Sequence, residues 1–105
     1  MIKTTLNAAG LPSWQARASN PPATTYAIYF DDVNADGPDG YNRIFTQDVM
    51  VELYEPLQDD VAEAAVEAEL NARGIPWTKQ ARYWLDNVRR YQVIYEFSYI
   101  EKRRT

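Results

Sequence analysis

The chain has 105 residues, of which 46% are hydrophobic and 25% charged, a composition that fits one folded domain and excludes a disordered segment. It contains no Cys and no His, which excludes disulfides, thiolate metal sites and catalysis by imidazole. The first ten residues hold one Lys and no apolar stretch of signal-peptide length, and no segment has the length of a membrane span, so we expect a protein made in the cytosol.

The net charge of −4 is divided unevenly along the chain. Residues 1–72 carry three basic and twelve acidic residues, a net charge of −9, whereas residues 73–105 carry eight basic and three acidic residues, a net charge of +5. One interpretation is an ordinary solvated surface, with both halves mixed in one sheet. The other is that copies of the chain associate acidic face to basic face, in a heterologous contact that can close into a ring.

The N-terminal quarter predicts two short elements. Residues 2–9 have the spacing of a short helix, with Ile2, Leu6 and Ala9 on one face and Gly10 as its stop. Residues 14–18 alternate in polarity and predict a short strand. The two prolines that follow this segment lack backbone donors and exclude regular structure there.

Two longer strands follow. Residues 26–33 are apolar on both sides, which is typical of a central strand covered on both faces. Residues 43–54 alternate more clearly and predict a strand with one core face and one mixed face. Residues 31–40 are acidic and contain two glycines, and we expect a long exposed loop between the strands.

A helix is predicted between Pro56 and Arg73. Asp60 and Glu63 have the spacing of a capping box, and acidic residues suit the first turn of a helix. Gly74 before Ile75 predicts a Schellman stop. The apolar positions at helical spacing are Leu57, Val61, Ala62, Ala65, Val66 and Leu70. The glutamates predicted to lie largely outside this stripe are Glu63, Glu67 and Glu69.

The C-terminal third predicts a strand over residues 77–85, a tight turn at Asp86 and Asn87, and a long strand over residues 88–102. Residues 102–105 are expected to form a mobile basic tail. Strand pairs without helical crossovers predict an α+β domain: an antiparallel sheet with one long central helix and a short N-terminal helix packed on one face.

One candidate metal site lies in the acidic loop. Asp32, Asn34, Asp36 and Gly37 have the spacing of the first half of an EF-hand loop, which binds Ca²⁺. The position that requires a bidentate Glu is Arg43, and the flanking elements are strands rather than helices. The pattern therefore favours a soluble acidic turn, with a small calcium-binding or ligand-binding module as the alternative.

Catalysis and nucleic-acid binding are both disfavoured. The carboxylate pairs Asp31 with Asp32 and Asp59 with Asp60 lack a neighbouring nucleophile or phosphate cradle, so we expect neither an enzyme nor a cofactor. Basic and aromatic residues alternate over residues 77–91, as in some nucleic-acid-binding surfaces. Cross-strand pairing in a sheet explains that pattern as well, and the chain as a whole is acidic.

Three segments resemble a known family. They are Thr25 to Asp32 (TYAIYFDD), Asp48 to Glu55 (DVMVELYE) and Gln92 to Tyr99 (QVIYEFSY). Together with the stretch from residue 22 to residue 102, they are similar to small head-to-tail interface proteins of tailed bacteriophages and prophages, of the tail completion or tail terminator type.

The resemblance implies a non-enzymatic structural protein of the virion, assembled in the bacterial host cytoplasm. Such a protein forms a ring, commonly of six subunits, that caps the tail tube and joins it to the head connector. DNA would pass through the lumen without specific binding, which suits an acidic chain.

The interface residues expected for this role are charged. The partner contacts are predicted at the acidic loop and the basic tail, with Asp31, Asp32, Asp36, Asp39, Lys102, Arg103 and Arg104. Ring formation is predicted to join Glu63, Glu67 and Glu69 of one copy to Arg82, Arg89 and Arg90 of its neighbour.

Overall fold

The computed structural model describes the backbone of residues 2–36 and 42–104, and the side chains of residues 2–33 and 46–100. In chain order the elements are α1 (Ile2–Ala8), β1 (Ser13–Gln15), β2 (Tyr26–Asp36), β3 (Asn42–Glu55), α2 (Asp60–Ala72), β4 (Trp77–Lys79), β5 (Tyr83–Leu85) and β6 (Arg90–Arg104). None of the helices in these ranges is long and apolar enough to cross a membrane. The predicted α+β class is confirmed.

The sheet is built on three long strands. Its order is β1-β2-β3-β6-β4, and β5 also pairs with β6, beside β4. All pairs are antiparallel except β1 with β2, which run parallel. The sheet is therefore mixed rather than purely antiparallel, because residues 16–25 carry the chain back to the end of the sheet at which β1 begins.

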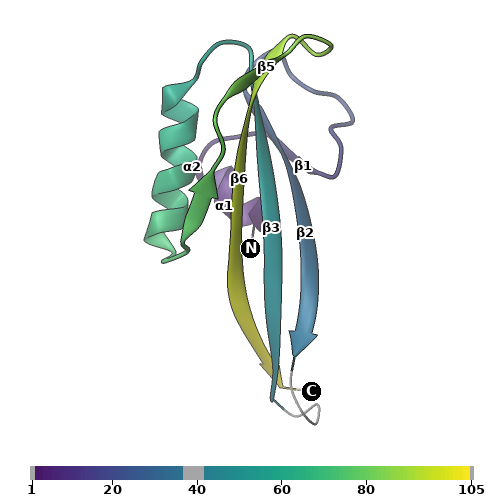
Figure 1. The fold of residues 1–105 in the computed structure, drawn as a ribbon, viewed down its shortest axis with the longest axis vertical. Helices are drawn as coiled ribbons and strands as arrows, with labels where there is room; N and C mark the ends of the chain where they lie inside the picture. The colour runs from purple at the N-terminus through teal and green to yellow at the C-terminus, as the bar shows by residue number, and fades with distance from the viewer. Residues whose placement is uncertain (1, 37–41, 105) are drawn as a thin grey trace.

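Side chains alternate between the two faces of the sheet, and the register of the strands places apolar side chains opposite one another. Ala27, Leu53 and Val93 are opposite one another, and Tyr29, Val51 and Tyr95 form the next row. These rows and the apolar residues of both helices form one core, so both helices cover the same face. In Figure 1, α2 lies beside the sheet and α1 behind it.

Helix α2 is held by caps at both ends. Asp59, rather than the predicted Asp60, is the N-cap, and its Oδ1 accepts from the amide of Ala62 at 3.0 Å. At the other end Gly74 has a φ of +68°, and the amide of Ile75 donates to Leu70 at 3.0 Å. The predicted Schellman stop is thus confirmed.

The buried stripe of α2 differs from the predicted one. Leu57 precedes the helix and is 76% exposed, and Val61 is 82% exposed, because both lie on the side away from the sheet. Glu63 was expected outside the stripe, yet it is buried beside Val66. A carboxylate is tolerated there because two cations from the following segment reach it, as described below.

Three predicted elements have different bounds. The strand expected over residues 14–18 ends at Gln15, because Ala16 has a φ of 67°. The strand expected over residues 77–85 is divided into β4 and β5, since residues 80–82 leave the ladder and bring Arg82 to α2. The turn before β6 spans residues 86–89 rather than two residues.

The long strands continue past the helices, as the lower half of Figure 1 shows. The molecule is consequently elongated, with extents of 49 × 26 × 22 Å.

Two predictions about the ends of these strands are wrong. Residues 31–36, expected in a loop, belong to β2, and residues 102–104, expected in a mobile tail, belong to β6. Pairing of both strands with β3 supplies the hydrogen bonds that make an extended backbone favourable despite many charges.

Candidate interaction surface

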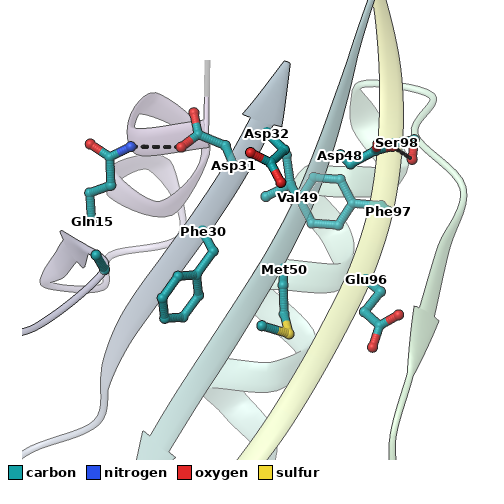
Figure 2. A pocket seen from close by; sticks show the side chains of 11 residues that line it. Gln15, Phe30, Asp31, Asp32, Asp48, Val49, Met50, Glu96, Phe97 and Ser98 are labelled. Carbon is teal, nitrogen blue, oxygen red and sulfur yellow. Dashed lines mark hydrogen bonds between the residues drawn. The ribbon is translucent and has the colours of Figure 1, made fainter. Parts of the chain in front are cut away.

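The sheet face opposite the helices carries a shallow groove of about 790 Å³ that crosses β2, β3 and β6. Figure 2 shows it with Phe30 and Met50 between carboxylates of all three strands. The residues that line it are Gln15, Ala16, Phe30, Asp31, Asp32, Asp48, Val49, Met50, Glu96, Phe97 and Ser98. Because no basic residue is in this set, the groove presents an apolar floor with an acidic rim.

The carboxylates of the groove are held by neutral donors. Asp31 accepts from Nε2 of Gln15 at 2.7 Å, and Glu96 accepts from Nε2 of Gln80 at 2.7 Å. Asp48 accepts from the hydroxyl of Ser98 at 2.6 Å. Neutral donors fix the carboxylates without cancelling their charge, so this face suits a partner with basic and apolar groups.

An aromatic cluster lies near the start of β2, outside the residues that line the groove. Tyr26 stacks on Tyr54 with ring centroids 5.2 Å apart, and Trp14 meets Tyr26 edge-on at 6.0 Å. The hydroxyl of Tyr54 donates to Glu52 at 2.8 Å. Burial and the neighbouring Glu52 carboxylate raise the pKa of Tyr54 to about 12. This half of the face is therefore filled by the chain's own side chains.

A network of charges lies on the opposite side, between α2 and the sheet. Arg82 contacts Glu63 at 2.5 Å and Glu55 at 3.4 Å. Lys79 contacts Glu63 at 2.7 Å and Glu67 at 2.8 Å. Glu55 and Glu63 are almost fully buried, whereas the two cations reach the surface with their stems along the fold.

Neighbouring groups set the protonation of these buried carboxyls. Burial and the adjacent Glu63 carboxylate raise the pKa of Glu55 to about 7, although its Oε1 accepts from the amide of Asp59 at 3.1 Å. Burial alone would raise the pKa of Glu63, but hydrogen bonds from Lys79 and Arg82 lower it. Below neutral pH the pair therefore favours a neutral Glu55 beside an ionised Glu63.

Tyr95 connects this network to the sheet. Its hydroxyl donates to Oε2 of Glu67 at 2.6 Å, and burial together with that carboxylate raises its pKa. Nζ of Lys79 lies 5.6 Å from the centre of the Tyr95 ring. The Lys stem thus lies along an aromatic face within the sheet, the arrangement expected of cross-strand pairing.

The structure places the predicted ring contacts differently. Glu63 and Arg82 contact each other within one chain, Glu67 pairs with Lys79, and the third helix glutamate, Glu69, pairs with Arg73 one turn later. These glutamates are thus engaged within the subunit. Arg82, nineteen positions after Glu63, thus already occupies within one chain the site on α2 that was predicted for an arginine of a neighbour.

Two other predicted arginines lie where the turn after β5 meets β6: Arg89 ends the turn and Arg90 begins β6. Arg89 is exposed and has a φ of 55°. Arg90 donates to the carbonyls of Arg89 at 3.0 Å and Ala23 at 3.4 Å, which fastens the turn to the segment before β2. Next to them Trp84 meets Tyr91 edge-on at 5.0 Å. Arg89 is therefore the more accessible of these two cations.

The acidic and basic ends of the long strands were predicted as partner contacts. Asp31 and Asp32 are exposed on β2. Asp36 ends β2, and residues 102–104 end β6; their side chains lie outside the described set. Asp39 lies outside the described residues altogether.

The alternative calcium site does not fit this backbone. Asp32 and Asp36 lie four positions apart in β2, and an extended strand separates such residues by roughly 13 Å. An EF-hand loop must curl so that alternate oxygens converge on one ion, and the strand prevents this. Among the side chains that the structure describes, no group of three Asp or Glu residues is placed to hold a metal ion.

Sequence reasoning missed the groove. In the sequence, the apolar residues of its floor, such as Met50, were recognised only as members of a strand face of mixed polarity. Alternation of polarity along one strand does not show that residues from three strands form a groove.

No family model matches the sequence, and no curated protein matches it.

Proposed function

We propose that this chain is a structural protein of a tailed bacteriophage virion that forms a ring at the head-to-tail joint. The observation that carries the proposal is the extension of β2, β3 and β6 beyond the helices (Figure 1). Phe30, Val33 and Ile100 lie on this extension and are 37%, 51% and 66% exposed. Large apolar side chains on a projecting sheet favour burial against another protein surface.

The resemblance of three segments to the tail completion and tail terminator family supplies the biological setting. In that role the ring caps the tail tube and joins it to the head connector, with acidic surfaces that suit a lumen through which DNA passes. The acidic groove provides a second surface on the same sheet, suited to a basic partner such as a tube or connector subunit.

The first experiment is a mass measurement by sedimentation over a wide range of protein concentration, at low and high salt. We expect a discrete oligomer whose population grows with concentration, and rings in negative-stain images. A chain that stays monomeric at every concentration and salt would contradict ring formation.

A second experiment tests the setting. Inactivating the gene in the virus that encodes it should give filled heads and separate tails, because the joint is missing. Particles that remain joined and infectious would contradict a function at the head-to-tail interface, whatever the oligomeric state of the isolated chain.

A further inference from the structure

The projecting part of the sheet has two free edges. We define the arm as the residues 30–36 of β2, 42–50 of β3 and 98–104 of β6. Strand β1 pairs with β2 only up to Tyr29, and β4 pairs with β6 only up to Phe97. Within the described parts of the chain, no strand pairs with the outer side of β2 or of β6 along the arm.

The free edges carry backbone groups in position to pair. The amide of Ala27 donates outward to Pro12, and the carbonyl of Tyr29 accepts from Ala16, both at 2.9 Å. Because outward groups recur at every second residue, Asp31 and Val33 continue this outward series on β2. On β6 the carbonyl of Ile94 points outward, because it accepts from the amide of Gln80 at 2.9 Å. Every second residue after Ile94 therefore also directs its backbone groups to the outer edge of β6.

The two edges have opposite charge. Residues 30–36 of β2 include three acidic and no basic residues, a net charge of −3. Residues 98–104 of β6 include one acidic and three basic residues, a net charge of +2. Charged edges ordinarily protect a sheet from pairing with other sheets. Here the signs disfavour pairing between two like edges but favour pairing between unlike ones.

We propose that the outer edge of β2 in one copy pairs with the outer edge of β6 in the next copy. This inference rests on the proposed ring and names the contact that forms it. Both strands are antiparallel to β3, so they run in the same direction. Copies related by rotation therefore join in a parallel pairing, which is heterologous and leaves no free arm edge once the ring closes.

The occupant is a second copy because both halves of the contact exist on each chain. Each edge spans seven residues, or roughly 23 Å of strand, enough for a ladder of several hydrogen bonds. The exposed Phe30, Val33 and Ile100 lie on the same two strands and would be partly buried by it. Ladder bonds, apolar burial and opposite charge thus favour the same contact.

Disulfide trapping tests the contact, because the natural chain has no Cys. Chains with Asp32→Cys are mixed with chains with Ser98→Cys or Ile100→Cys, one of the two carrying a tag, and oxidised in air. All three positions share one face of the sheet, and two acceptor positions allow for a shift in register. We expect a mixed dimer of tagged and untagged chains from at least one combination, and larger cross-linked species when one chain carries both cysteines.

A matched control uses Ile28→Cys. Ile28 lies on the same strand and face as Asp32, but its edge is covered by Trp14 of β1, so it should give no mixed dimer. Within one chain the two edges are two strand spacings apart, about 10 Å, which is too far for an internal disulfide.

The outcomes separate this inference from the proposed function. A ring that forms without the mixed dimer overturns the edge contact and leaves the ring. Dimers of two Asp32→Cys chains, or of two Ile100→Cys chains, overturn it as well, because like edges would then meet. A chain that is monomeric under all conditions overturns the proposed ring itself.

Discussion

Arg82 reaches back from the segment after β4 to contact Glu63 of α2 at 2.5 Å. Glu63 is 3% exposed and Arg82 is 23% exposed, so the pair lies at the boundary of the core. Much of the charge division seen along the sequence is therefore neutralised inside the subunit. The ends of the long strands and the groove carry charge outside this network.

Arg82→Ala should strongly destabilise the fold. Removal of the guanidinium leaves Glu63 with Lys79 alone and takes the nearby cation from buried Glu55. Loss of one partner from a buried ion pair costs about 3 kcal/mol, and urea denaturation should show a loss of unfolding free energy of this order. Arg89→Ala, at an exposed turn position, is the control and should change the free energy of unfolding by less than about 0.5 kcal/mol. Equal effects of the two changes would mean that the network contributes little.

Stability should decrease as pH rises, owing to Glu55. In the folded chain the pKa of Glu55 is about 7, above the ordinary value for a glutamate. The stability that Glu55 contributes to the fold is therefore complete below the pKa that it has in the unfolded chain, and is lost as pH rises through 7. Oε2 of Glu55 is buried without a hydrogen-bond partner among the described atoms, which penalises the ionised form. The pKa of Glu63 is lowered in the folded chain, so the ionised Glu63 stabilises the fold. This stabilisation is lost only at lower pH, where the carboxylate becomes protonated.

Glu55→Gln should therefore flatten the pH dependence between about pH 5 and about pH 8, removing a decline of about 1–3 kcal/mol. Denaturation by urea at several pH values measures it. Glu69→Gln, on the exposed pair with Arg73, should keep the decline of the natural chain. If the unfolding free energy of Glu55→Gln still declines as pH rises, a group other than Glu55 causes the decline.

Asp59→Ala should destabilise α2 at its N-terminus. Asp59 accepts from the amide of Ala62 at 3.0 Å and from the hydroxyl of Thr25 at 2.5 Å, so the change frees a backbone donor and a hydroxyl. Loss of such a cap costs about 1 kcal/mol. Asp59→Asn keeps one side-chain oxygen for the Ala62 amide and should recover most of the loss in thermal denaturation. No difference between the two variants would exclude the cap as the cause.

Local patterns predicted the elements that depend on neighbours in sequence. The stop of α2 at Gly74 and the core face of β3 follow from a glycine in the left-handed region and from period-two alternation. The burial of Glu63 was missed because its partner Arg82 lies nineteen positions away. Residues 31–36 were assigned to a loop because acidic residues are rare in strands, whereas pairing with β3 decides their structure. The free edges and the groove arise from strand order, which no local pattern encodes.

Assembly should respond to exchange of charge between the two arm edges. Asp31→Lys with Asp32→Lys makes the β2 edge basic, so it should repel the basic β6 edge of the next copy. Lys102→Glu with Arg103→Glu makes the β6 edge acidic and should repel the acidic β2 edge. Each double variant alone should lose the oligomer in sedimentation at low salt, and high salt should reduce the difference from the natural chain.

An equimolar mixture of the two double variants should regain the oligomer, because each altered edge then meets an edge of opposite sign on the other variant. Strict alternation closes only in a ring with an even number of subunits, and a ring of six, the number that the sequence resemblance implies, meets this condition. Arg89→Glu reverses a charge outside the arm, at a residue for which the sequence alone predicts a ring contact; if the arm edges form the contact instead, this variant should leave assembly unchanged. A mixture that stays dissociated, while Arg89→Glu assembles normally, would show that the arm edges do not meet across copies.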